Sequence, residues 1–367
     1  MRKTIRAFPK DALRWAYLRQ SKNVQNVGVC FAPFRGHWRV HKTLLETVLL
    51  REIGARIRAR RIARWIAGFR PELLWVHAEE EAVNVGFFLR RALGIPMHLT
   101  FHDAPEIAAS DFIGYSRASS ALYLARVRQL IRHAAALDAV SAELAEHVKA
   151  LAGYDDIPSM MLPPSATRNR AGQLDTPITG GHARRIGFCG SPRVSESQWR
   201  EFLALLGRLS FDFEIIAFVE QQGFFRATPA ANTTIVFQGY APTEEDIVRF
   251  FSAEQVAACY LGLWKEPGKA LFCRTSLSSK LATYAAAGLP VIVDGPKESV
   301  AWSLVGQYDA GVRWDGGGES EAEIASLFGD AWVWQRKAFG MRKLQAEHLD
   351  LETNLARFSE HVANLRR

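Results

Sequence analysis

Short apolar runs alternate along the chain with longer segments in which apolar residues recur at helical spacing. The runs predict β-strands, because they are rich in valine, isoleucine, leucine and phenylalanine and end at glycine, proline or polar residues. The expected strands are 27–32, 73–77, 97–101, 160–164, 185–189, 213–219, 234–237, 255–261 and 291–293, and residues 137–142 begin a further strand–helix unit. The expected helices include 9–20, 41–68, 82–93, 143–151, 197–209 and 331–365. Strands that alternate with helices in this way predict an α/β fold with parallel sheets.

The length of 367 residues and a segment rich in glycine, threonine, asparagine and proline divide the chain into two domains. We expect an N-terminal domain over residues 1–168 and a linker over 169–183. A second domain then covers 184–335, and a C-terminal helical segment covers 336–367.

The stretch 276–294 contains the most informative local pattern. Ser278 and Ser279 are predicted to cap a helix that ends at Gly288, and Pro290 and a β-branched strand follow. The N-terminus of this helix, with two hydroxyls and Lys280 in its first turn, is a place where an anion can bind. The alternative is an ordinary αβ unit of a parallel sheet.

The sequence Ser-Lys-Leu, small residues and then Ala-Gly-Leu-Pro-Val-Ile-Val resembles the C-terminal signature of GT-B glycosyltransferases. The resemblance is to the retaining, nucleotide-sugar-using group 1, or family 4, enzymes of bacterial polysaccharide synthesis. It implies two doubly wound Rossmann-like domains facing across a cleft, with the last helix crossing back to the first domain. In that family a glutamate five positions before the glycine binds the ribose, and a second acid stands eight residues earlier. Here these positions are Thr283 and Thr275.

The resemblance also implies roles for individual residues. His102 and Asp103, which follow the strand 97–101, match a strand end that faces the donor sugar. The donor diphosphate is expected at Gly190, Arg193, Arg274, Ser278, Ser279 and Lys280, and the nucleoside at Gly239, Tyr240 and Thr283. Gly36 and His37 follow the first strand, where ligands bind in open α/β sheets, and are assigned to the acceptor side.

Charge is distributed unevenly. Residues 1–170 contain 26 lysines and arginines against 15 acids, a net of +11; subtraction from the totals of 46 and 38 leaves 20 against 23, or −3, for residues 171–367. An anionic partner is therefore expected for the first half. The arginines from Arg51 to Arg64 lie on a predicted amphipathic helix, which either binds an anionic membrane surface or packs on the core with a solvated basic exterior. No aromatic stacking platform accompanies them, which disfavours nucleic acid.

Four scattered cysteines without a C-x-x-C pair, an N-terminus without a signal-peptide core, and the lack of a long apolar run favour a cytoplasmic protein, with the inner face of the membrane as an alternative location. No Asp-x-Asp metal motif is present, so no metal and no cofactor are expected. The expected function is metal-independent transfer of a sugar from a nucleotide-sugar donor to a hydroxyl of a glycan or lipid-linked acceptor. The alternatives are a non-catalytic GT-B scaffold or glycan-binding subunit, favoured by Thr275 and Thr283, and a GT-B nucleotide-sugar epimerase.

Overall fold

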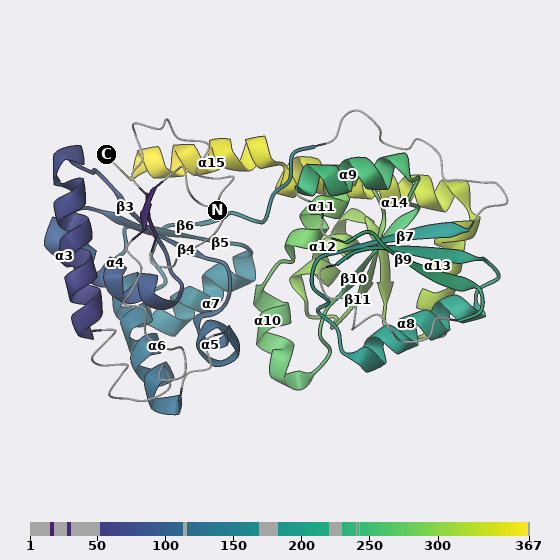
Figure 1. Ribbon diagram of the computed structural model, residues 1–367, viewed down its shortest axis with the longest axis horizontal. Coiled ribbons are helices and arrows are strands. Elements are labelled where there is room, and N and C mark those ends of the chain that lie inside the picture. The colour runs from purple at the N-terminus through teal and green to yellow at the C-terminus, as the bar shows by residue number, and fades with distance from the viewer. Residues whose placement is uncertain are drawn as a thin grey trace. The chain divides into compact units, whose positions relative to one another are not determined.

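The computed structural model of the chain describes residues 15–17, 28–30, 52–112, 116–168, 183–219, 230–239, 241 and 243–365. Two compact units are present (Figure 1). Unit 1 consists of Met1–Leu162 together with Leu355–Arg367, and unit 2 of Pro163–Asn354. Residues 169–182 of the predicted linker lie outside the described residues. None of the described helices is both long enough and apolar enough to span a membrane.

Unit 1 contains a sheet of four parallel strands in the order β3-β4-β5-β6. The strands are β3 (Leu74–His77), β4 (Met97–Phe101), β5 (Ala136–Ala139) and β6 (Ser159–Met161). The helices around it are α3 (Gly54–Ile66), α4 (Glu80–Leu93), the short α5 (Pro105–Ile107), α6 (Arg117–Arg132), α7 (Ala142–Ala152) and α15 (Leu351–Asn364). Figure 1 shows α15 on one side of these strands and α4, α6 and α7 on the other.

The alternation of side chains along β3 explains this layering. The Trp75 ring lies 4.8 Å from the ring of Phe358 on α15, measured between centroids. The next residue, Val76, points to the opposite face, where α4 approaches so closely that a Cβ at Gly86 would lie 2.9 Å from Val76 Cγ1. Both faces of the sheet are therefore covered, as expected for a parallel sheet.

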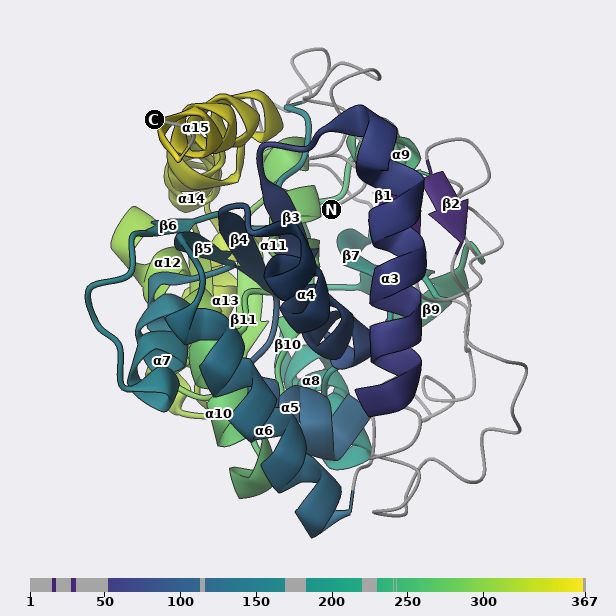
Figure 2. The same cartoon turned by 90° about the vertical axis from the view of Figure 1, so that its left-hand side faces the viewer.

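Helix α3 lies beside α4 (Figure 2), but it buries a different face from the one its isoleucines suggest. Ala55 and Ala59 are buried with Ile62 and Ile66. Ile53 and Ile57, which are one helical turn apart in the sequence, are 51% and 49% exposed. The small alanines allow the close approach to α4, and this packing rotates the two isoleucines outward.

A further two-stranded parallel sheet pairs β1 (Trp15–Tyr17) with β2 (Gly28–Cys30). The strand expected at 27–32 is confirmed over these residues. The helix expected at 9–20 is wrong at 15–17, where pairing with β2 places an aromatic-rich segment in a strand, as β propensity allows.

Unit 2 contains six parallel strands in the order β12-β11-β10-β7-β8-β9. Its strands are β7 (Arg184–Cys189), β8 (Phe213–Phe218), β9 (Thr233–Phe237), β10 (Ala258–Gly262), β11 (Val291–Asp294) and β12 (Gly311–Trp314). Its helices are α8 (Glu196–Arg208), α9 (Glu244–Ala253), α10 (Ala270–Thr275), α11 (Ser279–Ala287), α12 (Val300–Tyr308), α13 (Gly318–Gly329) and α14 (Ala331–Leu344). Figure 1 shows α9 and α11 on one face of the sheet and α8 on the other. The strand order reverses between β7 and β10, which is the point where doubly wound sheets bind ligands.

The predicted unit at 276–294 is present as α11 followed by β11. Gly288 has φ +71° and its N–H donates to the carbonyl of Ala285 at 2.9 Å, so it ends the helix in the left-handed conformation as predicted. Ser278 occupies the N-cap position, but its hydroxyl makes no capping hydrogen bond, so the prediction of a side-chain cap is wrong.

The helix predicted over 331–365 is interrupted. After α14, a π-helical turn covers Gln345–Leu349, and α15 then begins. The carboxylate of Asp350 accepts from the N–H of Thr353 at 2.9 Å, a local side-chain bond that starts a new helix. Gln345 Nε2 donates to the carbonyl of Ala166 at 2.9 Å and fixes the preceding turn.

Candidate functional site

Two loops follow the neighbouring strands at which the order of the unit 2 sheet reverses. The first loop begins at Gly190 after β7, and the second at Leu263 after β10. Because the two strands are parallel, their carboxyl ends lie at the same edge of the sheet. Gly190 has φ +76°, which only glycine adopts without strain, and a Cβ there would lie 3.4 Å from the side chain of Lys280. The predicted glycine turn therefore lies directly beside the predicted lysine.

Lys280 lies in the first turn of α11 and points toward the β7 loop. Its side-chain Nζ donates to the carbonyl of Ser191 and lies 5.4 Å from the centroid of the Phe188 ring. Only 8% of the residue is exposed. Burial lowers the pKa of the Lys280 amine to about 8, and the nearby charge of Arg193 acts in the same direction. The amine is thus still largely cationic at pH 7 and would gain from an anionic partner.

Arg193 lies close to the same place and is held by aromatic rings. Its guanidinium carbon is 4.9 Å from the centroid of Trp264 and 5.5 Å from that of Phe272. The Nζ atom of Lys269 also lies over Trp264, at 5.2 Å. Two aromatic rings from the segment after β10 thereby position cationic side chains beside the β7 loop, through cation–π contacts. Arg274 lies in the last turn of α10 with an exposed side chain.

The first turn of α11 offers more than Lys280. Because the hydroxyl of its N-cap Ser278 does not bond back to the helix, backbone N–H groups of this turn have no side-chain cap. Ser279 is exposed at the first helical position. Amide groups, the helix dipole and Lys280 together make an anion-binding surface.

Thr283, one turn further along α11, is paired with a carboxylate that we did not single out from the sequence. Its hydroxyl donates to Glu244 Oε1 at 2.6 Å. Glu244 is the first residue of α9, and Thr243 caps that helix by accepting from the N–H of Asp246. In the sequence, the acids after Thr243 are those expected in the first turn of any helix. Nothing in this local pattern therefore predicted the contact between Glu244 and Thr283.

The other residues expected at the nucleoside lie as follows. Gly239 follows β9 with φ +73°, and Tyr240 lies outside the described residues. Thr275, at the second acid position, is 3% exposed and its hydroxyl donates to the Leu271 carbonyl at 2.7 Å. The Thr275 hydroxyl is therefore already hydrogen-bonded within its own helix.

Lys265, in the loop after β10, neutralises a carboxylate inside the sheet. Its Nζ lies 2.6 Å from Oδ1 of Asp294, which is fully buried. Tyr260 donates its hydroxyl proton to the other oxygen of Asp294 at 2.7 Å. Burial raises the pKa of Asp294, while Lys265 opposes this rise.

We expect Lys265→Met to lower the stability of unit 2 by about 2–3 kcal/mol at pH 8, because it leaves the charge of Asp294 buried without its partner. A carboxyl whose pKa is raised by folding favours the folded state at low pH and loses that advantage as pH rises through the folded pKa. The loss of stability caused by Lys265→Met should therefore become smaller as the pH falls toward 4. Denaturant unfolding of wild type and Lys265→Met at pH 4, 6 and 8 checks this, with the exposed Lys297→Met as control; an equal deficit at all three pH values would contradict it.

In unit 1, His102 and Asp103 follow β4 and are both partly buried. The ring centroid of His102 lies 4.3 Å from that of His77, the last residue of β3. Burial lowers the pKa values of both imidazoles, that of His77 to about 3, and His102 adds to the shift of His77. Both rings are therefore neutral at pH 7. Gly36 and His37, expected on the acceptor side, lie outside the described residues.

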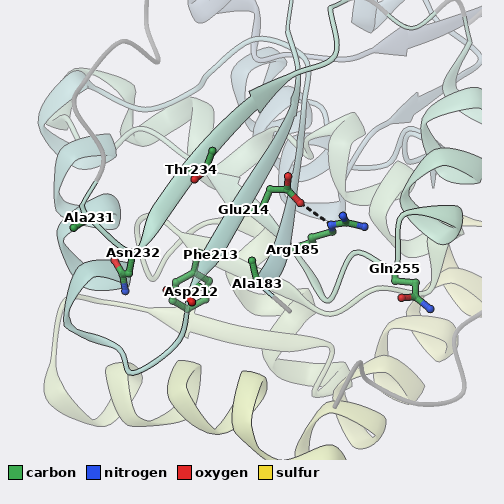
Figure 3. Close-up of a pocket in the computed structure, with 9 residues that line it drawn as sticks. All are labelled: Ala183, Arg185, Asp212, Phe213, Glu214, Ala231, Asn232, Thr234 and Gln255. Atoms are coloured by element: carbon green, nitrogen blue, oxygen red, sulfur yellow. Dashed lines mark hydrogen bonds and ion pairs between the residues drawn. The ribbon is translucent and has the colours of Figure 1, made fainter. Parts of the chain in front are cut away.

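A hollow of about 520 Å³ lies at the opposite, amino-terminal edge of the unit 2 sheet. Figure 3 shows the residues that line it, which include Arg185 and Glu214 joined by an ion pair. Arg185 also bonds to the backbone carbonyl of Glu254 at 2.7 Å, and Asn232 donates its amide to three backbone carbonyls. These polar groups are already paired with one another or hydrogen-bonded to the backbone. The hollow contains none of the residues predicted for the site.

Comparisons with known proteins agree on the fold. Residues 19–164 match the family model of the glycosyl transferase 4-like domain. A glycosyltransferase from Rickettsia africae ESF-5 is similar in structure, with a TM-score of 0.66 and 11% identity, over 99% of this chain and 94% of that one. Anabaena Alr3699/HepE in complex with UDP and glucose has a TM-score of 0.63 and 12% identity over the same shares. The lipopolysaccharide outer core galactosyltransferase WaaB has a TM-score of 0.55 and 10% identity over 84% of this chain and 80% of that one. No curated protein sequence matches.

Proposed function

Since the chain has the GT-B fold and is related to the glycosyltransferases of that fold, with a glycosyl transferase 4-like domain over residues 19–164, we propose that it transfers a sugar from a nucleotide-sugar donor. The acceptor is a hydroxyl of a glycan or a lipid-linked molecule in bacterial surface polysaccharide synthesis. The observation that supports this most strongly is the meeting of Lys280, Arg193 and the first turn of α11 at the reversal point of the unit 2 sheet. UDP is bound in the similar Anabaena structure, which makes it the first donor base to test.

The positive groups at this edge have a direct role in the proposed reaction. When the bond between the sugar and the diphosphate breaks, negative charge builds on the leaving diphosphate. Groups that are already in place to meet this charge stabilise the transition state without further reorganisation. We assign that role to Lys280, Arg193 and the amides of Ser278 and Ser279, with Arg274 as an outer cation. Gly190 lets the phosphate approach the backbone. The reaction needs no cofactor and no metal ion in this proposal.

Glu244 supplies the carboxylate that the α11 sequence lacks. The resemblance places a ribose-binding glutamate at the position of Thr283, and the structure has Glu244 2.6 Å from the Thr283 hydroxyl. An ionised carboxylate accepts hydrogen bonds through two oxygens, so Glu244 can accept from ribose hydroxyls in place of a glutamate at position 283. We propose that Glu244, Thr283 and Gly239 receive the nucleoside. Tyr240, which lies outside the described residues, stays assigned to the nucleoside from its place in the sequence.

His102 is proposed to orient the donor sugar, and Asp103 to orient His102 or the acceptor. A neutral imidazole donates or accepts one hydrogen bond per nitrogen, which suits a sugar hydroxyl, and burial keeps His102 neutral at pH 7. We assign His102 a positioning role. Gly36 and His37 stay assigned to the acceptor side.

A panel of UDP-, GDP-, ADP-, CDP- and dTDP-sugars tests the proposed function. We expect one base to support release of the nucleoside diphosphate, faster when bacterial membranes are added as a source of acceptor, and at least tenfold slower release by His102→Ala. A protein that binds a nucleotide sugar but consumes none, with or without membranes, would instead be a non-catalytic relative. The two threonines at 275 and 283 are the observation that favours this second candidate.

Nucleotide affinity should depend on pH through Lys280. A bound diphosphate stabilises the ammonium form and raises its pKa above the free value of about 8. Below pH 8 the lysine is charged with or without ligand, so the affinity is constant. Above pH 8 each binding event takes up a proton, and the affinity falls by up to about tenfold per pH unit. Calorimetry of UDP binding at pH 9 in two buffers of different ionisation enthalpy measures this uptake, and identical heats in both buffers would contradict it.

Helix α3 carries the proposed membrane contact. Arg56, Arg60, Arg61 and Arg64 are exposed on it, together with Ile53 and Ile57, whereas Arg58 is buried 3.5 Å from Glu81. Arg51 lies outside the described residues. Basic side chains around exposed isoleucines suit the surface of an anionic membrane from the cytoplasmic side.

Replacing the four exposed arginines with glutamine should weaken binding to phosphatidylserine vesicles at least tenfold, because each contributes about 1 kcal/mol near such a surface. Wild-type binding should also decrease as salt rises from 50 to 300 mM. Vesicle flotation measures both effects. Arg200→Gln with Arg249→Gln, two exposed arginines of unit 2, is the control. Vesicle binding that does not change with salt concentration would contradict the membrane proposal. So would unchanged binding by the variant with the four arginines replaced.

A further inference from the structure

Three potential metal ligands meet at the carboxyl edge of the unit 1 sheet. His77 is the last residue of β3, Glu79 follows two residues later, and His102 is the first residue after β4. Each offers one ligand atom, and these atoms lie within 4.8 Å of one another. No other group of three histidine, cysteine, aspartate or glutamate side chains within the described part of the chain lies as close. The cluster belongs to unit 1 alone.

The backbone around these residues is fixed by the sheet. β3 and β4 pair with His77 opposite Thr100, and the N–H of Ala78 donates to the carbonyl of Thr100 at 2.9 Å. The N–H of Glu79 donates to the carbonyl of His77 at 2.8 Å, which turns the chain before α4. The three side chains are therefore presented by a rigid edge, which is the arrangement that a preorganised site needs.

His77 has a nitrogen that the protein leaves unused. Its Nε2 is buried and makes no hydrogen bond, although Oε1 of Glu79 lies only 3.2 Å away. A buried nitrogen without a hydrogen bond is costly unless something else meets it. The edge of one imidazole faces the other at a centroid distance of 4.3 Å, so both rings border the same small space.

We propose that His77, Glu79 and His102 form a binding site for a divalent transition metal ion of the zinc type. Two imidazoles and one carboxylate are a zinc ligand set that leaves the fourth position open. Zinc ligands at bond lengths of about 2.0–2.2 Å in tetrahedral geometry lie about 3.4 Å apart. The three ligand atoms already lie within 4.8 Å of one another, so metal binding requires them to move closer together by at most about 1.4 Å. Magnesium and calcium are disfavoured, because they prefer oxygen ligands.

The metal site and the proposed sugar contact share His102. A metal ion there takes the lone pair of one imidazole nitrogen and adds positive charge where the donor sugar is proposed to lie. We therefore expect zinc to reduce the release of nucleoside diphosphate from the donor. The metal site itself does not depend on the proposed function, because its ligands and its test require no nucleotide.

Titration of the chelator-treated full-length protein with Co²⁺ and Zn²⁺ tests the site. We expect one ion per chain, with visible Co²⁺ absorption bands typical of a four-coordinate site, which Zn²⁺ then abolishes. His77→Ala and Glu79→Gln should each weaken Zn²⁺ affinity at least tenfold in calorimetry. His147→Ala is the matched control, since His147 forms a partly exposed pair with Glu106 in the same unit at 3.0 Å. Circular dichroism verifies that each variant is folded.

Absence of Co²⁺ bands and of Zn²⁺ binding at 0.1 mM metal would overturn the proposal. Zn²⁺ affinity that is unchanged in Glu79→Gln and His77→Ala but reduced in His147→Ala would place the ion elsewhere and would also overturn it. Neither result bears on nucleotide binding by unit 2, so failure of the metal site and failure of the transferase proposal are distinguishable.

Discussion

Replacing Asp138 with alanine is expected to lower the free energy of unfolding of unit 1 by about 3–5 kcal/mol. Asp138 is 1% exposed, and its Oδ2 lies 2.6 Å from Nε2 of His98, which is fully buried. The same oxygen accepts the hydroxyl proton of Thr100 at 2.6 Å, and Thr100 in turn accepts from Trp75 Nε1 at 2.8 Å. Removal of the carboxylate leaves two buried polar groups without their acceptor and opens a cavity.

The loss should extend to α15, because this helix packs on the same polar group. The ring of His98 lies 5.4 Å from that of Phe358 and 5.3 Å from that of His361. Hydrogen exchange followed by mass spectrometry should show faster exchange in β4, β5 and residues 355–364 of Asp138→Ala. The exposed Asp155→Ala, in the same unit, is the control. A loss below about 1 kcal/mol, with unchanged exchange in α15, would contradict the central role of Asp138.

The second large effect is expected from Lys280→Ala, which should weaken binding of the nucleoside diphosphate about 10- to 100-fold. A hydrogen bond to a charged group contributes about 1.5–3 kcal/mol, and a change of 1.4 kcal/mol is tenfold in affinity. The lysine is already held against the carbonyl of Ser191 beside Gly190, so its charge is in place before the ligand arrives. Arg193→Ala should weaken binding by a similar factor, because its guanidinium is fixed over Trp264.

Lys297→Ala serves as the control for Lys280→Ala. Lys297 is 67% exposed in the same unit and forms a surface ion pair with Asp315 at 3.0 Å, so its removal should leave nucleotide affinity within twofold. Calorimetric titration of wild type, Lys280→Ala, Arg193→Ala and Lys297→Ala under one set of conditions gives their dissociation constants. Equal affinities for wild type and Lys280→Ala would show that the diphosphate does not bind at the first turn of α11.

The parts of the fold that follow from local patterns were predicted from the sequence. The α11 and β11 unit is such a part, because Gly288 and the β-branched run after it act within a few residues. The parallel sheets followed from the alternation of strands and helices. The interruption near Asp350 was missed because one capping side chain ended a helical pattern that otherwise continues. The burial of α3 through Ala55 and Ala59 was missed because isoleucine spacing dominates the local pattern.

The candidate site was predictable only in part, for a physical reason. Lys280 and Gly190 each lie in a recognisable local motif, and the structure brings them together. Glu244 reaches Thr283 through the packing of α9 on α11, which depends on strand order. His77 and Glu79 meet His102 because β3 and β4 are neighbours. Contacts between distant segments depend on the order of the strands in each sheet. The sequence pattern predicts the class of fold but not this order.

The most direct test of a nucleotide-sugar site in unit 2 is calorimetric titration of the wild-type protein with UDP, GDP, ADP, CDP and dTDP. A ligand that binds only the folded protein also raises its melting temperature, which gives a second readout. We predict that one diphosphate, with UDP as the first candidate, binds with a micromolar dissociation constant at one site per chain. No binding by any of the five at millimolar concentration would contradict the site and would favour a non-catalytic role for the chain.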